Sequence, residues 1–248
     1  MTFRKNNTYK YEAGKTFKLS RSGIDSFIKC QRCFYLNKVG NIKDIGMPAF
    51  SLNSAHDELM KKELDICREK AEAHPYMESL KRNLIPFQHE NMEDWRNNFK
   101  GITYHHEKTD LILTGSVDDV WIDIDTEELV IVEYKSTSTQ GEIDLNDGTP
   151  WKEQYKRQID IYQWLFKMNG FKVANDSVFL YSNGLKTSKR FNDVMKFKTY
   201  VLEYKGSTEW VEPKILEIKK VLDQNSVPRL NENCDTCSYV ESVQTYST

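Results

Sequence analysis

The sequence predicts a mixed α/β fold in which a central sheet is flanked by helices. Helical and strand-like spacings of apolar residues follow one another in the order helix, helix, strands, helix, strands, helix. One segment, Leu129–Val132, is apolar without interruption, as expected of a buried strand. With 248 residues, 39% of them hydrophobic, the chain is long enough for one large domain with a core and a very polar surface.

The N-terminal part predicts two helices. Residues 1–18 are polar, and we expect them to be loosely ordered. Ser20 or Ser22 is a suitable N-cap for a first helix. Its apolar residues share roughly one face: Ile24, Phe27, Ile28 and Phe34. A second helix is expected from about Leu52 to Ala73, and residues 75–100 predict no clear element. The inward residues of this second helix are expected to be Leu52, Ala55, Leu59 and Leu64.

The remaining elements follow from the same periodicities and from turn residues. They are strands between Ile102 and Thr137 with turns at Gly115 and Asp123–Glu128, a polar loop over Ser138–Thr149, a helix over Trp151–Met168, strands over Val173–Tyr181 and Val194–Tyr204 joined at Gly184, and a helix over Thr208–Leu222. We expect one domain over residues 19–248. It comprises a helical part at 19–100, a core at 101–205, and a C-terminal helix with a cysteine tail at 206–248.

Composition gives weak constraints on function. The formal net charge of −2 neither indicates nor excludes binding to nucleic acid, because a local basic stripe is enough. No apolar run approaches the roughly 20 residues needed to span a bilayer, so no membrane partner is expected. The first residues have no apolar core of the kind found in secretory signals. We therefore expect a cytoplasmic protein, in which the five cysteines serve as metal ligands or packing residues rather than in disulfides.

Two carboxylates and a lysine form the candidate active site. Glu133 and Lys135 are two residues apart, so in a strand their side chains leave the same face. Asp118 lies in a preceding strand that we expect to end beside them. Carboxylates can hold Mg²⁺ or Mn²⁺, to which the Tyr134 carbonyl could be a further ligand, and the lysine can stabilise charge on a phosphate. This combination suggests metal-dependent hydrolysis of phosphodiesters, although a Glu-x-Lys pair on an edge strand is common by chance.

The motifs around this site resemble those of the PD-(D/E)xK nuclease superfamily, specifically its RecB-like branch, which includes exonucleases of CRISPR adaptation and of recombination complexes. The resemblance rests on the segments GSVDDVW at 115–121 and IVEYKST at 131–137, on a Q-x-x-x-Y pair formed by Gln158 and Tyr162, and on His56 in an upstream helix. It spans about residues 20–240 and implies a restriction-endonuclease-like core with a central mixed sheet.

The resemblance implies roles for these residues. His56, Asp118 and Glu133 would bind Mg²⁺ or Mn²⁺, and Lys135 would be the catalytic lysine. Gln158 and Tyr162 are one helical turn apart, and they would hydrogen-bond the active site or DNA phosphates. Taken alone, Tyr162 is more typical of a residue that packs in the core, and His56 is more typical of a surface or satisfied histidine than of a metal ligand.

Four of the cysteines form two C-x-x-C pairs near the ends of the chain. Cys30 with Cys33 and Cys234 with Cys237 could make one Cys₄ site that joins the first helix to the C-terminal tail. In the iron–sulfur class of RecB-like nucleases, one early cysteine and three late ones bind the cluster, whereas this chain has two and two. The resemblance therefore slightly favours an iron–sulfur cluster over zinc, and both remain open, as does packing without a metal. Cys67 is expected to be a packing residue.

The expected partner is DNA, either single-stranded or at duplex ends. Lys152, Lys156 and Arg157 are candidates for phosphate contacts, although a solvated helix face is an equal alternative. The best interpretation is a metal-dependent DNA exonuclease of a prokaryote or a phage, acting in recombination, repair or CRISPR-type adaptation. A helicase or recombinase could be a partner, since the sequence has no phosphate-binding loop of its own. The alternatives are a DNA-binding subunit that does not cut and a site-specific endonuclease.

Overall fold

The computed structural model describes residues 8–43 and 51–246. The chain divides into two compact units. Unit 1 comprises Met1–Pro48, Thr103–Thr114 and Glu209–Thr248, and unit 2 comprises Ala49–Ile102 and Gly115–Thr208. The predicted mixed α/β class is confirmed, but the strands form two sheets rather than one. The expectation of a single domain stays a prediction, and the part of the expected loose N-terminus that covers residues 1–7 lies outside the described residues.

Unit 1 combines a small sheet with helices. Its elements are β1 (Phe17–Ser20), α1 (Arg21–Lys29), α2 (Gln31–Lys38), β3 (Ile102–His106), β4 (Leu111–Gly115), α7 (Val211–Asp223) and α8 (Asp235–Thr245). The strand order is β1-β4-β3, with β1 and β4 parallel. Helix α7 packs against α1 and α2 and contributes the buried residues Val211, Ile215, Ile218 and Leu222. These residues recur every three or four positions, the spacing of one helix face.

The first helix is interrupted at Cys30, where the sequence predicted continuity. Ser20 is the N-cap of α1, and its hydroxyl accepts the Gly23 backbone N–H at 3.2 Å. Cys30 has an extended backbone (φ −161°), which ends α1, and it is also the N-cap of α2. The resulting bend brings Phe27 and Phe34 into edge-on contact, with their ring centroids 5.3 Å apart. The thiol at position 30 therefore sits between two helices rather than within one.

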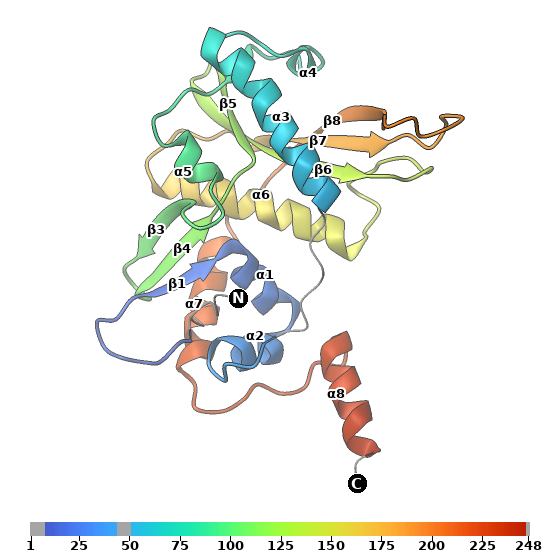
Figure 1. Ribbon diagram of the computed structural model, residues 1–248. Coiled ribbons are helices and arrows are strands. Elements are labelled where there is room, and N and C mark those ends of the chain that lie inside the picture. The colour runs from blue at the N-terminus through green and yellow to red at the C-terminus, as the bar shows by residue number, and fades with distance from the viewer. Residues whose placement is uncertain (1–7, 44–50, 247–248) are drawn as a thin grey trace. The chain divides into compact units, whose positions relative to one another are not determined.

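Unit 2 is built on a mixed five-stranded sheet (Figure 1). Its elements are α3 (Ser51–Lys70), α4 (Pro75–Glu78), β2 (Leu84–Pro86), α5 (Met92–Arg96), β5 (Asp119–Asp123), β6 (Glu128–Thr137), α6 (Pro150–Met168), β7 (Asp176–Gly184) and β8 (Phe197–Lys205). The strand order is β2-β5-β6-β7-β8, in which only β6 and β7 run parallel. The connection between these two parallel strands contains α6, because parallel strands cannot be joined by a tight turn.

The two faces of this sheet are covered by different helices (Figure 1). On one face, Val130, Val132 and Tyr134 of β6 pack with Met60 and Leu64 of α3. On the other face, Phe179 and Tyr181 of β7 pack with Ile159 of α6. Because side chains alternate along a strand, Glu133 and Lys135 must lie on the α6 face and Tyr134 on the α3 face.

Two predictions about these elements were wrong, and one helix was missed. In α3, Leu52 and Leu59 are 74% and 65% exposed, and Ala55 is exposed as well. Of the residues predicted to face inward, Leu64 is buried, and the buried residues of α3 are Met60, Leu64 and Arg68, all at or after the middle of the helix. Gly184 is the last residue of β7 and pairs with Phe197, so the connection is residues 185–196 rather than a turn at that glycine. Helix α8 in the tail was not predicted either.

The helices were also compared with the requirements of a membrane span. Within residues 8–43 and 51–246, none of them is both long enough and apolar enough to cross a bilayer.

Candidate active site

The ends of β5 and β6 bring two acidic residues together. Asp118 directly precedes β5, and the antiparallel register that pairs Asp119 with Val132 sets Asp118 beside Glu133. Asp118 Oδ2 accepts the backbone N–H of Tyr134 at 2.8 Å. Burial and the nearby charge of Glu133 together raise the pKa of Asp118 to about 7. The two carboxylates therefore repel each other, and a cation between them would relieve that repulsion.

Glu133 uses only one of its two carboxylate oxygens. Its Oε1 accepts Lys135 Nζ at 2.5 Å and Gln158 Nε2 at 2.6 Å. Its Oε2 is buried and has no hydrogen-bond partner among the described residues. A buried carboxylate oxygen without a partner is costly, so its presence in a folded protein calls for a ligand that satisfies it.

Lys135 is held as a cation at this site. Burial lowers its pKa, but the charges of Glu133 and Asp118 raise it by more, so the net shift is upward. Its Nζ lies 4.3 Å from the centroid of the Tyr155 ring and 3.4 Å from Gln158 Oε1. The ammonium group is thus fixed by an acid, an aromatic face and an amide, and it is protonated at neutral pH.

Helix α6 supplies the amide that orients Glu133. Gln158 and Tyr162 lie one turn apart, and Gln158 Nε2 also lies 3.0 Å from the Tyr162 hydroxyl, which accepts its second N–H. Both side chains are buried. Gly115 allows this close approach, because a Cβ there would lie 2.6 Å from Tyr162 Cε1. Gly115, where the sequence predicted a turn, is instead the last residue of β4, and its role here is in packing.

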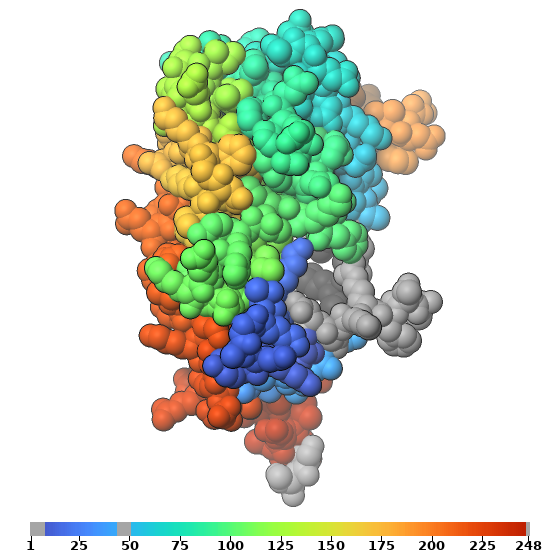
Figure 2. All heavy atoms as spheres, turned by 90° about the vertical axis from the view of Figure 1, so that its left-hand side faces the viewer, coloured from blue at the N-terminus to red at the C-terminus, as the bar shows by residue number. Residues whose placement is uncertain are grey.

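His56 is not joined to the two carboxylates by any hydrogen bond within the described ranges. It is half-buried on α3, and its ring centroid lies 5.3 Å from that of Phe197. It lines an apolar groove between α3 and the β7–β8 hairpin, together with Leu59, Phe191 and Met195. Figure 2 shows the tip of this hairpin, in orange, standing out beside α3. Burial lowers the pKa of His56, which favours its neutral, ligand-competent form.

The neighbours of Asp118 on α3 are two residues that the sequence reasoning missed. Burial and then the charge of Asp118 raise the pKa of Asp57. Asp57 Oδ2 binds Lys61 Nζ at 2.7 Å, and the charge of Asp118 also raises the pKa of Lys61 against the effect of burial. The spacing of four between Asp57 and Lys61 was a usable signal, since such residues share a helix face. This spacing indicates a charged face of α3 next to His56.

The second aspartate of the DD pair has a structural role that was also missed. Asp119 is fully buried and accepts hydrogen bonds from Arg68 and from Arg96 Nη2, the latter at 2.9 Å. The Tyr134 hydroxyl donates to its other oxygen at 2.8 Å. Tyr134, predicted to offer its carbonyl to a metal, thus holds Asp118 through its N–H and Asp119 through its hydroxyl. The two adjacent aspartates therefore have different roles, since Asp118 belongs to the acidic site and Asp119 to a buried network of ion pairs.

The predicted DNA-binding cations at the start of α6 are already engaged. Lys152 is buried and paired with Asp147, and Lys156 Nζ binds Glu153 Oε1 at 2.8 Å. Arg157 is half-buried. Their part in binding DNA stays a prediction, and the two acidic partners would have to be displaced by a phosphate.

The four cysteines of the two C-x-x-C pairs are brought together in unit 1. Their sulfur atoms all lie within 4.8 Å of one another, and none is in a disulfide. Cys30, Cys234 and Cys237 are buried and Cys33 is half-buried. Burial raises the pKa of the Cys30 and Cys33 thiols. Cys67 is on α3 in unit 2 and is not part of this cluster.

The acidic site also fits a hard divalent cation, on two observations. Glu133 offers a buried oxygen that no group within residues 8–43 and 51–246 satisfies, and Asp118 has a raised pKa that a nearby cation would lower. Oxygen donors of this type are those that Mg²⁺ and Mn²⁺ prefer.

The chain was compared with families and proteins that are already known. A family model described as the PD-(D/E)XK nuclease superfamily matches residues 18–242, which is most of the chain. A search of the curated proteins finds none that matches.

Proposed function

The chain belongs to the PD-(D/E)XK nuclease superfamily, and we propose that it is a divalent-metal-dependent deoxyribonuclease with its active site at Asp118, Glu133 and Lys135. The observation that carries this proposal is that both hydrogen-bond donors of Glu133 bind the same carboxylate oxygen. Lys135 and Gln158 donate to the same oxygen, and the other oxygen is buried without a hydrogen-bond partner in the part of the chain that the structure describes. Such an arrangement suits the capture of a cation beside a fixed ammonium group, the two charges that phosphodiester hydrolysis needs.

Asp118 and Glu133 are the proposed ligands for Mg²⁺ or Mn²⁺, with the Tyr134 carbonyl as a further donor. The ion would supply Lewis-acid stabilisation of charge on the phosphate. On α3, His56 is the ligand implied by the resemblance, and Asp57 is the alternative that the electrostatics support, since burial and then the charge of Asp118 raise the pKa of Asp57.

Lys135 is proposed to stabilise negative charge as a cation rather than to act as a base. Its raised pKa keeps it protonated, so it can stabilise the negative charge that develops on the phosphoryl oxygens. Gln158 is a positioning residue. It donates to Glu133 and to the Tyr162 hydroxyl, and the two bonds fix the rotamer of the acid.

The finer assignment is an exonuclease of the RecB-like branch that acts on single strands or duplex ends. The motif order from His56 to Tyr162 supports it by resemblance. The basic start of α6, with Lys152, Lys156 and Arg157, is the proposed phosphate-binding segment, on the same helix as Gln158. Recombination, repair and CRISPR-type adaptation are the processes that use this chemistry.

A cleavage assay with matched lysine variants tests the proposal. Linear single-stranded and duplex DNA, labelled at one end, is incubated with Mg²⁺ or Mn²⁺ and with the wild type, Lys135→Ala or Lys172→Ala. Lys172 is a suitable control because its Nζ donates to the Thr126 carbonyl at 2.7 Å, in the loop before β6, and not to a residue of the proposed site. We expect metal-dependent cutting by the wild type and the control, and a loss of at least about 100-fold in Lys135→Ala. Equal cutting by all three proteins would exclude the mechanism.

Circular substrates separate the exonuclease from the endonuclease. A closed single-stranded circle has no end, so an exonuclease leaves it intact while degrading the linear form of the same sequence. Cleavage of the circle at the same rate would refute the exonuclease assignment and leave the nuclease assignment in place. Binding of linear DNA without any cutting in either metal would favour a non-cutting subunit.

A further inference from the structure

The sulfur atoms of the four clustered cysteines have the spacing of ligands around a single ion. Cys30 lies 3.7 Å from Cys237, Cys33 lies 3.7 Å from Cys234, and Cys33 lies 3.8 Å from Cys237, measured between the Sγ atoms. Zn–S bonds of about 2.3 Å in a tetrahedron place the sulfur atoms about 3.8 Å apart. The measured separations agree with that value.

An iron–sulfur cluster requires a wider arrangement. In a [4Fe–4S] cluster each thiolate binds a different iron, and in a [2Fe–2S] cluster two thiolates bind each iron. The distance between sulfur atoms bound to different irons is therefore longer than the distance between two sulfur atoms bound to one ion. All four sulfur atoms here lie within 4.8 Å of one another, so no pair is spread across a cluster. From this geometry we infer that the Cys30, Cys33, Cys234 and Cys237 site binds one tetrahedral Zn²⁺ ion and not the iron–sulfur cluster that the resemblance slightly favours.

The two cysteine pairs are held in matching local structures. Cys30 is the N-cap of α2 and Cys234 is the N-cap of α8, so in each pair the second cysteine lies in the first turn of a helix. The Cys33 backbone N–H donates to Cys30 Sγ at 3.5 Å. Helix N-termini carry partial positive charge, which stabilises the thiolates that a metal requires. Two C-x-x-C pairs of this kind, each at the N-terminus of a helix, are suited to a closed Cys₄ site, in which no coordination position remains open for catalysis.

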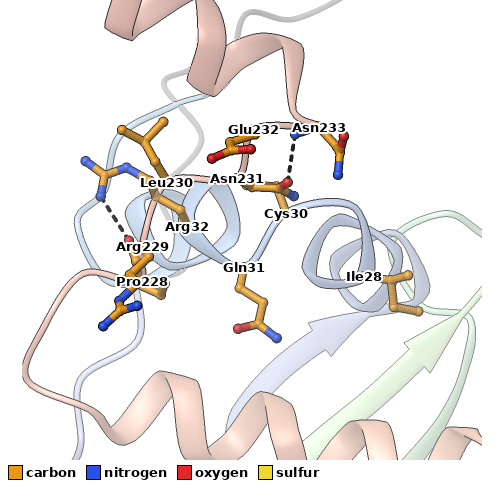
Figure 3. A pocket seen from close by; sticks show the side chains of 10 residues that line it. All are labelled: Ile28, Cys30, Gln31, Arg32, Pro228, Arg229, Leu230, Asn231, Glu232 and Asn233. Atoms are coloured by element: carbon orange, nitrogen blue, oxygen red, sulfur yellow. Dashed lines mark hydrogen bonds between the residues drawn. The ribbon is translucent and has the colours of Figure 1, made fainter.

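The chain around the pairs is arranged to keep them together. Figure 3 shows the segment from Pro228 to Asn233 passing beside Cys30 and Arg32. Arg32 Nη1 donates to the Pro228 carbonyl at 2.9 Å, and Asn231 Nδ2 donates to the Lys29 carbonyl at 3.3 Å. These bonds align the tail with the start of α2 and so position Cys234.

Helix α8 depends on the metal for its place in unit 1. Cys237 is its only buried residue, whereas Tyr239 and Val240 are 64% and 48% exposed. Apolar packing therefore does not hold this helix, and the metal–sulfur bonds of Cys234, at its N-cap, and of Cys237, in its first turn, do. The ion is structural. It closes a loop of roughly 200 residues between the two pairs, and its binding is independent of the proposed nuclease activity.

Metal analysis tests the inference. The full chain is purified without oxygen from cells grown with both zinc and iron, and zinc, iron and acid-labile sulfide are measured per chain. We expect about one zinc, no sulfide and no visible colour. Iron with a matching amount of sulfide would overturn the inference in favour of a cluster, and one iron without sulfide would overturn the choice of zinc.

Cobalt substitution and cysteine variants complete the test. Protein isolated without metal is titrated with Co²⁺, which in a tetrahedral thiolate site gives intense charge-transfer and visible bands. The absence of these bands would refute the site. Cys234→Ser should lose the metal and expose the tail after Gln224 to protease, whereas Cys67→Ser, the matched control in α3, should keep one zinc. Equal zinc content in the two variants would contradict the assignment, whether or not either protein cuts DNA.

Discussion

Adjacent aspartates provide a sharp test, because the structure gives them opposite roles. Asp118 lies beside Glu133 and has a raised pKa, so its ionised form is disfavoured. Asp119 neutralises Arg68 and Arg96 in the interior. Replacing each by asparagine changes one atom and removes one charge. We expect Asp118→Asn to abolish activity without loss of stability, and Asp119→Asn to destabilise the protein strongly.

The cost of Asp119→Asn follows from the charges that it leaves behind. Removing one partner of a buried ion pair costs about 3–5 kcal/mol, because the remaining charge is uncompensated. Here Asp65 still pairs with both arginines, for example with Arg96 Nη1 at 2.9 Å. The expected loss therefore lies at the lower end, about 3 kcal/mol. For a chain of this length that corresponds to a decrease in Tm of about 6–12 °C.

The effect of Asp118→Asn has the opposite sign. A carboxylate whose pKa is raised in the folded state costs stability at any pH above its ordinary pKa, because folding disfavours the ionised form. The rise from 3.8 to about 7 is equivalent to roughly 4 kcal/mol at about 1.4 kcal/mol per pKa unit. Asp118 is partly exposed, so solvent screening reduces the expected gain to roughly 1–2 kcal/mol. Cutting should decrease by more than about 100-fold, since even the outer partners of a metal ligand are worth 10–100-fold.

Urea unfolding at pH 7 without added Mg²⁺ or Mn²⁺ measures both changes, and the cleavage assay is run on the same preparations at a temperature where both variants are folded. The wild type is the reference for each. Two results would refute the reasoning: a loss of stability in Asp118→Asn as large as that in Asp119→Asn, or full metal-dependent activity in Asp118→Asn.

Three further outcomes are expected. Gly115→Ala should lower the free energy of unfolding by about 1–3 kcal/mol through overpacking and reduce the cleavage rate, because the new methyl would lie 2.6 Å from an aromatic carbon of Tyr162 in α6. An unchanged Tm and an unchanged cleavage rate would contradict this. Hydrogen bonds, chiefly from Arg82, lower the pKa of Asp123 below 3.8 against the effect of burial, so the stability from this pair is complete above about pH 4 and disappears as pH falls through the lowered pKa. Arg82→Ala should therefore unfold at a higher pH in an acid titration followed by circular dichroism, and an unshifted midpoint would count against the pair. Asp57→Asn should weaken activation by Mn²⁺ more than His56→Ala if the carboxylate is the ligand on α3, and the reverse order in a metal titration would favour the histidine.

The parts of the site that sequence could predict are those set by local periods. Glu133 and Lys135 share a face because a strand alternates every two residues, and Gln158 and Tyr162 share one because a helix turns in about four. The distances of 2.5 Å between Glu133 and Lys135 and of 3.0 Å between Gln158 and Tyr162 are consequences of that spacing.

What sequence could not predict depends on register and on long-range packing. The contact of Arg96 with Asp119 joins residues 23 apart in the chain, and that of Arg68 joins residues 51 apart. Neither is encoded in a local period, because each requires the sheet to be formed first. Helix α8 was missed for a related reason. It has no apolar face that would identify it, and the residue that it buries is a cysteine.

Two buried carboxylates on neighbouring strands show how a structural ion pair differs from a chemical site. Asp119 has both oxygens engaged, one by Arg68 and Arg96 and the other by the Tyr134 hydroxyl. Its hydrogen-bonding capacity is met, so nothing remains for a ligand to bind. Glu133 is just as deeply buried, yet both of its donors converge on one oxygen. Had Lys135 and Gln158 taken one oxygen each, Glu133 would be another satisfied pair. The convergence leaves one carboxylate oxygen of Glu133 with no protein donor among the described residues, close enough to Asp118 for the charge of Glu133 to raise the pKa of Asp118, and a cation is the partner that balances the charge of both acids.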